Sequence, residues 1–409
     1  MTLRILVYPH TMEVGGSQLN AIELAAAVRD LGHQVAVAAE PGPLVETVDA
    51  LGLDRFEIPA SRRRPSPTMI RMLTRIVSEG GYDVVHGYEW PPAVESFLGP
   101  HRAGRRAAVA TVMSAEVAPF IPVTMPLVVG TDELARSVRS RGYRDVTLIE
   151  PPVDVLANSP SFAPGRFRAD HGLDGHFLVV VVCRLVRELK LEGLLTACDA
   201  VANLVAAGTD ARLAIVGDGP ERWLVEERAG AANARCGTRA VVLTGQLADP
   251  RPAYAAADAV LGMGGSALRG MAFGKPLIVQ GELGFWRPCT PDTVGSFLTG
   301  GWYGLGDGSD GTPGLERSLR ELIDDPALRA RLGDFARRLV VGRFGLTAAA
   351  QRQLDVYRRA VAGSRARVGR ESARCVVRVG GYKLRRRLDR LHGRAATDDF
   401  NSLARMRQR

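Results

Sequence analysis

Cysteine is scarce in this sequence, and its arrangement does not resemble a disulfide framework. The chain has 5 cysteines among 409 residues, and no two of them stand in C-x-x-C spacing. A zinc site and a set of paired disulfides are therefore not expected. We interpret the cysteines as reduced, mostly buried small apolar residues.

Long apolar runs are also absent. The longest runs, such as Phe177–Cys183, fall far short of the roughly 20 residues that a membrane helix needs. The opening run, Met1–Tyr8, is too short for a signal peptide and is broken by Pro9. These absences favour a cytoplasmic protein.

What is present is an ordinary globular composition with a basic excess. Hydrophobic residues make up 46% of the chain and charged residues 24%. At roughly 100–200 residues per domain, this length predicts two domains and an extension. The net charge is +9, and much of the excess lies near the C-terminus. Such a chain binds nucleic acid, an anionic membrane or an anionic substrate, or it carries a solvated basic tail.

The first part of the chain alternates strands and helices. A strand at Arg4–Tyr8 is followed by a loop at Pro9–Gly16 and a helix at Ser17–Leu31, with Ser17 as its N-cap. The next strand, Gln34–Ala39, completes a β-loop-α-β unit whose crossover is long enough for parallel pairing. Further strands are predicted at Asp83–His86, Ala107–Met113, Leu127–Val129 and Thr147–Ile149.

A second α/β series follows a linker at 155–175. Its first strand, Phe177–Cys183, is nearly pure valine, which is typical of a strand buried on both faces. The predicted strands that follow are Ala211–Val216, Ala240–Thr244, Ala259–Gly262 and Leu277–Val279. The predicted helices are Leu191–Ala207, Glu221–Ala234, Ser266–Phe273, Gly314–Ile323, Pro326–Val341 and Leu346–Val361. The tail from 363 is expected to form short helices or to be partly disordered.

Candidate ligand-binding groups stand at the ends of these strands. Gly15 and Gly16 precede the first helix, where glycines let a ligand approach the backbone and a helix start attracts anions; a tight turn explains them equally well. Arg184 and Lys190 follow the first strand of the second series, at the sheet edge where open α/β folds bind ligands. Together they could neutralise a diphosphate, or they could be two solvated surface cations.

The order of the motifs resembles the retaining glycosyltransferases of the GT-B fold, the large group that includes relatives of glycogen and sucrose synthases and many bacterial sugar transferases. The resemblance covers about residues 4–360 and is strongest from 180 to 280. It rests on Gly15-Gly16, Arg184 with Lys190, Val216-Gly217-Asp218-Gly219-Pro220, Leu243-Thr244-Gly245, Ala257-Asp258-Ala259-Val260 and Met271-Ala272-Phe273-Gly274-Lys275-Pro276.

The resemblance implies an α/β fold of two facing Rossmann-like lobes, each with a parallel sheet, and an interlobe cleft. We expect an acceptor-side lobe at 1–165, a donor-binding lobe at 166–345, a helix crossing back to the first lobe at 346–362 and a basic tail at 363–409. It implies a nucleotide-diphosphate sugar as donor and a sugar, a lipid-linked molecule or a small molecule as acceptor. Hexosyl transfer would proceed with retention of configuration, without a bound metal or other cofactor.

The resemblance also implies roles for single residues. Arg184 and Lys190 would bind the donor diphosphate and assist its departure, and Gly16 would lie beside the phosphates or the acceptor. The remaining donor-side positions are Gly15, Gly217, Gly219, Thr244, Gly245, Gly264, Ser266, Ala267 and Arg269.

The chain departs from the family where the family carries two glutamates in a pattern close to E-G-F-G-x-x-x-x-E-A-M-A. Leu261 and Arg269 stand at the two acidic positions, and Met113 stands where a histidine is common. Arginine has only donors, so Arg269 cannot accept hydrogen bonds from a ribose and could instead face a phosphate or a ligand carboxylate. Either the chain is an active transferase with a rearranged donor site, or it is a catalytically impaired partner protein that binds a sugar-nucleotide or a glycan.

Four other residues could take part in catalysis. Glu282, Glu13 and Glu89 lie in loops near strand ends, and each is either an acceptor-side base or a solvated carboxylate. His86 ends a predicted strand, where it either takes the proton of an acceptor hydroxyl or is a hydrogen-bonded structural residue.

The basic tail offers a membrane contact. Lys383–Arg387, with Tyr382, Leu384 and Leu388, could form a short amphipathic helix on anionic lipid at the inner face of the membrane. A lipid-linked acceptor would fit that contact, and a solvated tail is the alternative. No nucleic-acid recognition motif accompanies the charge.

Overall fold

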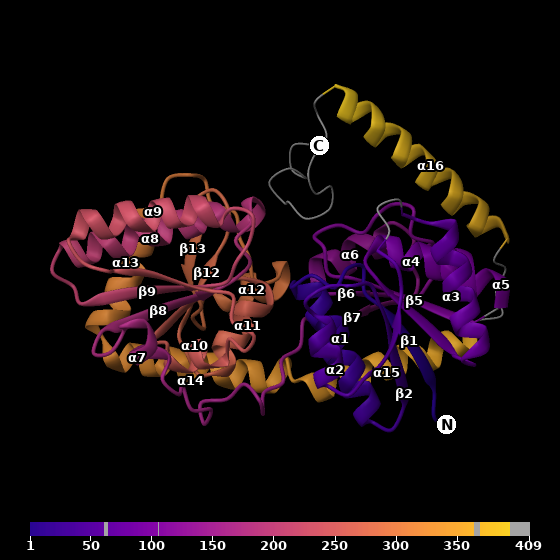
Figure 1. Cartoon of the computed structure of the whole chain (residues 1–409), viewed down its shortest axis with the longest axis horizontal. Coiled ribbons are helices and arrows are strands. Elements are labelled where there is room, and N and C mark those ends of the chain that lie inside the picture. Colours follow the sequence, from indigo (N-terminus) through magenta and orange to yellow (C-terminus); the bar gives the residue numbers. More distant parts are fainter. Residues whose placement is uncertain (61–63, 105, 364–368, 393–409) are drawn as a thin grey trace. The chain divides into compact units, whose positions relative to one another are not determined.

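The chain folds into two compact units. A computed structural model describes residues 1–60, 64–104, 106–363 and 369–392 (Figure 1). Unit 1 contains Met1–Glu150 and the described residues from Leu346 onward, and unit 2 contains Pro151–Gly345. The end of the predicted basic tail, residues 393–409, lies outside the described residues.

The boundary between the units differs from the predicted one at 165/166. The predicted linker packs on unit 2, because the Arg337 guanidinium donates to the carbonyl oxygens of Val155 and Asn158, each at 2.9 Å. The Val153 N–H also donates to the Phe344 carbonyl oxygen at 2.8 Å. Residues 151–165 therefore belong to the second unit and not to the first.

Unit 1 is built on a parallel sheet of seven strands, in the order β3-β2-β1-β4-β5-β6-β7. The strands are β1 (Arg4–Tyr8), β2 (Gln34–Ala39), β3 (Asp54–Glu57), β4 (Val84–Tyr88), β5 (Ala107–Val112), β6 (Leu127–Val129) and β7 (Val146–Leu148). The sequence did not predict β3, because this edge strand is mostly exposed and charged and has no apolar pattern.

Helices cover both faces of this sheet. They are α1 (Gly16–Asp30), α2 (Val45–Ala50), α3 (Pro67–Glu79), α4 (Trp90–Ser96), the π-helix η1 (Phe97–His101), α5 (Arg102–Gly104), α6 (Asp132–Ser140), α15 (Leu346–Gly363) and α16 (Gly369–Leu391). Gly15 is the N-cap of α1, and its first turn has no side-chain cap. Ser17 therefore lies inside the helix and is not the predicted N-cap.

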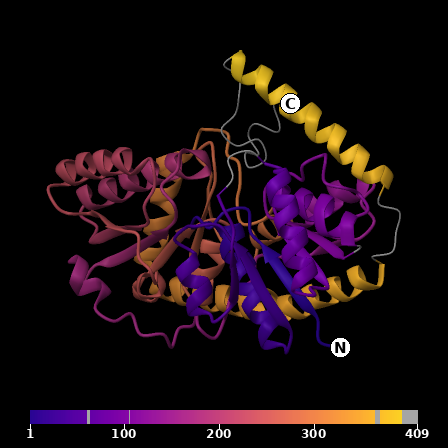
Figure 2. The ribbon, with the colours of Figure 1, turned by 45° about the vertical axis from the view of Figure 1, so that its right-hand side comes forward.

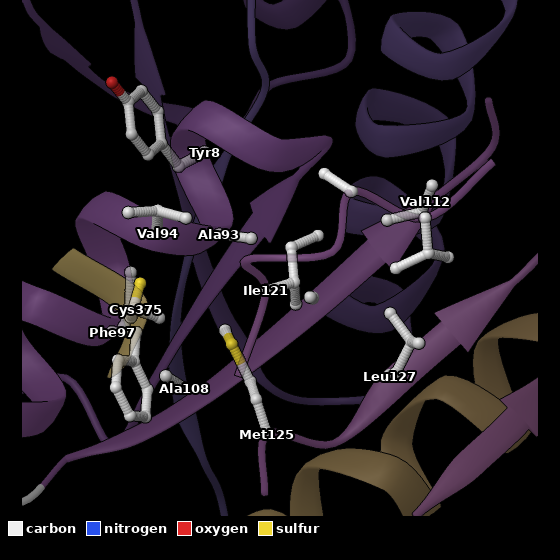
Figure 3. Close-up of a cluster of buried hydrophobic side chains, with 14 of the residues drawn as sticks. Tyr8, Ala93, Val94, Phe97, Ala108, Val112, Ile121, Met125, Leu127 and Cys375 are labelled. Carbon is white, nitrogen blue, oxygen red and sulfur yellow. The ribbon is translucent and has the colours of Figure 1, made fainter. Parts of the chain in front are cut away.

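Alternate residues of each strand point to opposite faces, which divides the core of unit 1 into two clusters. Leu6 and Tyr8 of β1 point into a cluster that also contains side chains of α3, α4, α6 and α16. Figure 3 shows part of this cluster, in which Phe97 of η1 and Cys375 of α16 belong to the same group. Ile5 points the other way, into the cluster covered by α1 and α15.

The tail contains one long helix in place of the predicted short helices. α16 runs without interruption from Gly369 to Leu391 and buries Ser372, Cys375 and Val379 against unit 1. The run of arginines and the Gly380-Gly381 pair interrupt the apolar pattern of this helix, so a single long helix was not predicted.

A buried hydrogen-bonded histidine joins α15 to the sheet of unit 1. His86 of β4 is fully buried, and its Nδ1 and Nε2 lie 2.7 Å from the hydroxyls of Tyr357 in α15 and Thr111 in β5. Burial lowers the pKa of His86 to about 3, so the ring is neutral in the folded protein. Helix α15 is thus joined to the sheet through a ring that is buried in its neutral form.

Unit 2 is built on a sheet of six strands, in the order β10-β9-β8-β11-β12-β13, parallel except for β13. The strands are β8 (Phe177–Val182), β9 (Ala211–Val216), β10 (Val241–Gly245), β11 (Ala259–Gly262), β12 (Leu277–Gln280) and β13 (Trp286–Pro288). The helices are α7 (Phe167–His171), the π-helix η2 (Arg187–Leu191), α8 (Glu192–Ala206), α9 (Arg222–Cys236), α10 (Arg251–Ala256), α11 (Gly264–Ala272), α12 (Val294–Gly300), α13 (Gly311–Asp324) and α14 (Pro326–Arg343).

The loops after β8 and β9 pack against each other through glycine. Gly217 has φ of +146°, and a Cβ at this position would overlap the carbonyl oxygen of Cys183. A Cβ on Gly219 would overlap the carbonyl oxygen of Leu185. The Leu185 N–H in turn donates to the Asp218 carbonyl oxygen at 2.9 Å. These glycines therefore set the position of the loop that carries Arg184 and Lys190.

The buried His86 should make stability depend on pH. The unfolded chain protonates this ring below about pH 6.5, whereas the folded protein does so only near pH 3. Stability is therefore present above pH 6.5 and falls by about 1.4 kcal/mol per pH unit as the pH drops through that window. His86→Gln, measured by urea unfolding at several pH values, should flatten the profile by about this slope. Parallel profiles for both proteins would contradict a neutral buried ring.

Gly217→Ala should destabilise unit 2 by about 2 kcal/mol or more, since the new Cβ meets the Cys183 carbonyl in a strained backbone region. Gly230→Ala is the matched control, because Gly230 is exposed inside α9 and its Cβ would meet nothing. That change should stabilise by about 0.5–1 kcal/mol. Thermal unfolding compares the two, and an unchanged midpoint for Gly217→Ala would refute the packing role.

Candidate functional site

Each sheet has a point at which the strand order reverses, and such a point is where open α/β folds bind ligands. In unit 2 this point lies at β8, which has β9 on one side and β11 on the other. In unit 1 it lies at β1, which has β2 on one side and β4 on the other. The loops after β8 and β11, and those after β1 and β4, therefore define the candidate site in each unit.

The loop after β8 carries three cations, and only one of them is neutralised. Arg187 forms an ion pair with Glu221 at 3.2 Å. Arg184 is exposed, and neither it nor the Lys190 ammonium has a hydrogen-bond or ion-pair partner among the residues that the structure describes. Burial lowers the pKa of Lys190, whose side chain is half-buried. An anion bound here would offset that cost and favour the charged lysine.

The backbone of this loop is held in an unusual conformation. Leu189 has φ of 65° and ψ of −18°, a left-handed conformation that is uncommon for a leucine. The Gln280 side chain, at the end of β12, donates to the Lys190 carbonyl oxygen at 3.1 Å. Gly193 makes room for this amide, because a Cβ there would overlap it. The backbone of Lys190, in the loop after β8, is thus also held by a side chain from the end of β12.

Glu192 joins the loop after β12 to the same place. Its carboxylate accepts hydrogen bonds from the N–H groups of Leu283 at 3.0 Å and Gly284 at 2.6 Å. The neighbouring Glu282 is half-buried, and its carboxylate accepts a hydrogen bond from the Tyr303 hydroxyl. Burial and this carboxylate raise the pKa of Tyr303. The predicted Glu282 therefore lies in the group of loops that also contains Lys190, but its carboxylate already has one partner.

The start of α11 forms the other side of this strand reversal. Only Met263 separates β11 from α11, and Gly264 adopts φ of 53° while its N–H donates to the Trp302 carbonyl oxygen at 2.8 Å. The Ser266 hydroxyl donates to the Met263 carbonyl oxygen at 2.9 Å, and Ala267 is buried in the core. The first N–H groups of a helix have no partner within it and attract anions. The Gly264 N–H is already paired and the Met263 side chain accepts from the Ser266 N–H, so a ligand would meet a helix start that is partly capped and surrounded by small residues.

Leu261, which stands at the first acidic position of the family, is a core residue and does not line the candidate site. It lies within β11, fully buried in the core of unit 2, so no acid could stand there without disrupting the strand. Arg269 lies on α11, half-buried, and its charge acts on the nearby Tyr254. The aligned acidic positions are thus a core leucine and a helical arginine, and the short connection through Met263 leaves no loop for the first acid.

The other residues predicted to contact the donor also form hydrogen bonds or packing contacts within unit 2. The Gly217 N–H donates to the Gly245 carbonyl oxygen at 2.9 Å, and the Thr244 hydroxyl donates to the same oxygen at 3.0 Å. Gly219 is required by the packing on Leu185. The Gly217 N–H and the Gly245 carbonyl are therefore already paired with each other.

In unit 1, a buried glutamate joins three loops at the strand reversal. Glu89 accepts hydrogen bonds from the Ser17 hydroxyl at 2.9 Å, the Met113 N–H at 3.0 Å and the Ser114 hydroxyl at 2.8 Å. Its backbone has φ of 65° and ψ of 175°, in a region that is almost restricted to glycine. Gly15 and Gly16 begin α1 just before Ser17, and Gly16 is exposed.

Glu89 was predicted to lie near the site, but its three hydrogen bonds to other segments were not predicted. Strain of this kind persists only where the surroundings impose it, and it concentrates at functional sites. The donors come from the first turn of α1 and from the loop after β5, so Glu89 positions these two segments at the carboxyl edge of the sheet. The sequence signal that could have revealed it is the pair of hydroxyl residues, Ser17 and Ser114, each following a strand end.

His86 and Glu13 fare differently from Glu89. His86 is buried beneath the site with both ring nitrogens hydrogen-bonded, which fits the structural interpretation that the sequence left open and leaves no face for an acceptor. Glu13 is an exposed loop carboxylate. Within the described ranges, no group of three or more His, Cys, Asp or Glu residues could hold a metal ion.

Two family models match successive parts of the chain. The model described as "Glycosyltransferase Family 4" matches residues 14–116, which include the unit 1 loops around Gly15, Gly16 and Glu89. The model described as "Glycosyl transferases group 1" matches residues 176–285, which include Arg184, Lys190 and the start of α11.

Individual proteins agree with this match. A D-inositol 3-phosphate glycosyltransferase of Kineococcus radiotolerans is 27% identical, with 87% of this chain and 93% of that protein covered. A 2-deoxystreptamine glucosyltransferase of Streptomyces kanamyceticus is 34% identical over 49% of this chain and 50% of its own length.

Solved structures share the fold. A glycosyltransferase of Rickettsia africae superposes with a TM-score of 0.72 at 15% identity, covering 89% of this chain and all of that one. Anabaena HepE in complex with UDP superposes with a TM-score of 0.69 at 16% identity, covering 87% of this chain and all of that one. Each unit is built on a parallel or largely parallel sheet covered by helices, and both family models match the chain. The chain therefore belongs to glycosyltransferase family 4, the retaining group 1 glycosyl transferases of the GT-B fold.

Proposed function

We propose that this chain transfers a hexosyl group, with retention, from a nucleotide-diphosphate sugar held by unit 2 to an acceptor hydroxyl held by unit 1. The donor site is inferred from the loop after β8, in which only one of three cations has an ion-pair partner among the described residues. Arg187 is neutralised by Glu221, whereas Arg184 and Lys190 keep their charges without a protein partner in the described part of the chain. Charges left unpaired at a strand reversal are suited to a diphosphate.

The two cations and the start of α11 act on the leaving group. As the bond between the sugar C1 and the diphosphate oxygen breaks, negative charge grows on that oxygen. Preorganised cations and helix N–H groups stabilise this charge more in the transition state than in the ground state. Burial lowers the pKa of Lys190, and phosphate oxygens beside its ammonium would favour the protonated form. The donor diphosphate is therefore both bound and activated by the same groups.

The acceptor oxygen forms its bond to C1 on the face that the diphosphate leaves, and the hydroxyl proton must go to a base. Glu282 is our proposed base, because it stands next to the Leu283–Gly284 turn that Glu192 ties to the Lys190 loop. Its hydrogen bond from Tyr303 orients the carboxylate. Arg269 is proposed to face a donor phosphate or a carboxylate on the ligand.

The identity of the partners follows from the relatives and the charge. Because HepE of Anabaena has been solved with UDP and with UDP-glucose, UDP is the nucleotide to test first. The acceptor is a sugar, a small molecule or a lipid-linked molecule, placed by the Glu89 loops of unit 1. We also propose a cytoplasmic location with a peripheral contact between the basic tail and an anionic membrane; among the described residues, no helix is long and apolar enough to cross one.

A second candidate is a catalytically impaired partner protein, which Leu261 and Arg269 in place of the two family acids favour. Incubation of the protein with UDP-glucose and candidate acceptors separates the two. Release of UDP supports transfer, and binding without release supports the partner protein.

Removal of the unpaired cations should abolish donor binding. Arg184→Ala and Lys190→Met should each weaken UDP binding by about 10-fold to 100-fold, since each removes one charge-assisted phosphate contact. Methionine retains most of the half-buried lysine stem, so the fold is kept. Arg187→Ala is the matched control in the same loop and should stay within about 2-fold of the wild type, because Arg187 already has a partner. Titration calorimetry with UDP gives the comparison, and equal losses in all three variants would refute the assignment.

Glu282→Gln should lower kcat by about 100-fold or more while UDP binding stays unchanged, because a positioned general base contributes at least that much. Tyr303→Phe is the companion variant, since it removes the hydrogen bond but keeps the carboxylate, and it should change kcat much less. Steady-state rates of UDP release distinguish them. If both variants lose the same activity, Glu282 positions the loop and is not the base.

A further inference from the structure

Helix α16 has one side that packs on unit 1. Ser372, Cys375 and Val379 are buried, and Tyr382 continues the same side one turn later. The Tyr382 ring packs at centroid distances of 5.8 Å from Trp90 and 5.1 Å from Phe120. This side of the helix is therefore held by an aromatic cluster.

A polar contact reinforces this packing. The Arg378 guanidinium donates to the Pro119 carbonyl oxygen at 3.1 Å, in the same segment as Phe120. Figures 1 and 2 both draw α16 along one side of unit 1. The Tyr382 ring, which the sequence placed on the lipid side, instead belongs to the protein side.

The opposite side of α16 carries a row of exposed aliphatic side chains. Val377 is 73% exposed, Leu384 62%, Leu388 48% and Leu391 75%. Their spacing of seven, four and three residues puts them in one row on a helix of 3.6 residues per turn. That row, which we name the outer stripe, lies across the helix from Cys375 and Val379. A water-soluble protein gains nothing from four large aliphatic groups in one exposed row.

Cations flank the outer stripe along both of its edges. At the same helical period, one edge holds Arg374, Arg378 and Arg385, and the other holds Lys383 and Arg387. Arg374 is also ion-paired with Glu371 at 3.1 Å. Glu371 and Asp389 are the acids within the helix. The outer face therefore combines an apolar row with a positive border on either side.

This combination selects one occupant. A second copy of the helix would bring two positive borders together, and a nucleic acid offers nothing to the aliphatic row. The surface of an anionic bilayer accepts both, because the aliphatic groups enter the boundary of the acyl chains while the long cationic side chains reach the lipid phosphates. Each cation near such a surface contributes about 1 kcal/mol, and two signals together give stable binding.

We propose that the outer stripe of α16, with its flanking cations, docks unit 1 on an anionic lipid bilayer. This inference deepens the membrane contact of the basic tail and rests on that part of the proposed function. It assigns the lipid contact to Val377, Leu384, Leu388 and Leu391 and the protein contact to the side with Tyr382. Docking would thus hold the acceptor-side unit, and not the donor-binding unit, at the membrane.

The experiment is flotation of the full chain with two kinds of vesicle, phosphatidylcholine alone and an equimolar mixture of phosphatidylcholine and phosphatidylglycerol. The wild type should float with the mixed vesicles and remain behind with phosphatidylcholine. Changing Val377, Leu384, Leu388 and Leu391 to Ser should lower binding at least tenfold, since it removes the apolar row and leaves every charge. Changing Arg374, Arg385 and Arg387 to Gln should lower it by about 100-fold, at about 1 kcal/mol per cation.

Matched controls remove similar groups elsewhere. Leu156→Ser with Val341→Ser removes exposed aliphatic residues of unit 2, and Arg235→Gln, Arg239→Gln and Arg320→Gln remove three exposed cations of that unit. Both control sets should bind vesicles as the wild type does. The thermal midpoint and the UDP affinity of every variant should stay unchanged, because the altered side chains of α16 are exposed.

The contrary outcomes are distinct. Failure of the wild type to float with mixed vesicles overturns the proposal. So does flotation that the four serines leave intact, because charge alone would then explain binding. A dimer in sedimentation analysis that the serines dissociate would show that a second copy covers the stripe, and it would also overturn the proposal. Vesicle binding by a protein that binds no UDP would sink the donor assignment alone.

Discussion

Parallel pairing of fully buried strands is the constraint on which the rest of this structure depends. It sends every parallel strand of a sheet towards the same edge, and the crossover helices cover both faces. In each unit the strand order reverses once, at β1 and at β8, so two loops diverge there and leave their backbone groups without a strand between them. Gly15 and Glu89 in unit 1, and Arg184, Lys190 and α11 in unit 2, are where they are for this reason.

The side chains at the two points of strand reversal differ in their hydrogen-bond and ion-pair partners. In unit 1 the protein supplies both partners, since the Glu89 carboxylate accepts three hydrogen bonds from α1 and the loop after β5. In unit 2 the loop after β8 supplies the positive partners, and Lys190 bears a desolvation cost without an ion-pair partner among the described residues. A closed hydrogen-bond hub positions loops, whereas an open pair of cations awaits an anion. The number of protein partners of each charged side chain thus distinguishes a residue that positions loops from residues suited to bind a ligand.

Much of the fold could be predicted from the sequence, because buried parallel strands are continuous apolar runs with turn residues at their ends. β1, β2, β6, β9 and β11 have the predicted bounds. What failed depends on contacts across the chain. Nothing local shows that His86 meets Tyr357 or that Gly217 makes room for the Cys183 carbonyl. The cations of the site were predictable by type and place, but their lack of partners was not.

The net charge of +9 has two sources that the sequence alone could not separate. The proposed donor site contributes few of these charges, and the excess is concentrated on α16, where it borders an aliphatic row. A tail that was merely solvated would not hold one side of a helix on Trp90 and Phe120 while exposing four large aliphatic side chains on the other. The cations proposed for the substrate and those proposed for a surface therefore lie on different units, unit 2 and unit 1.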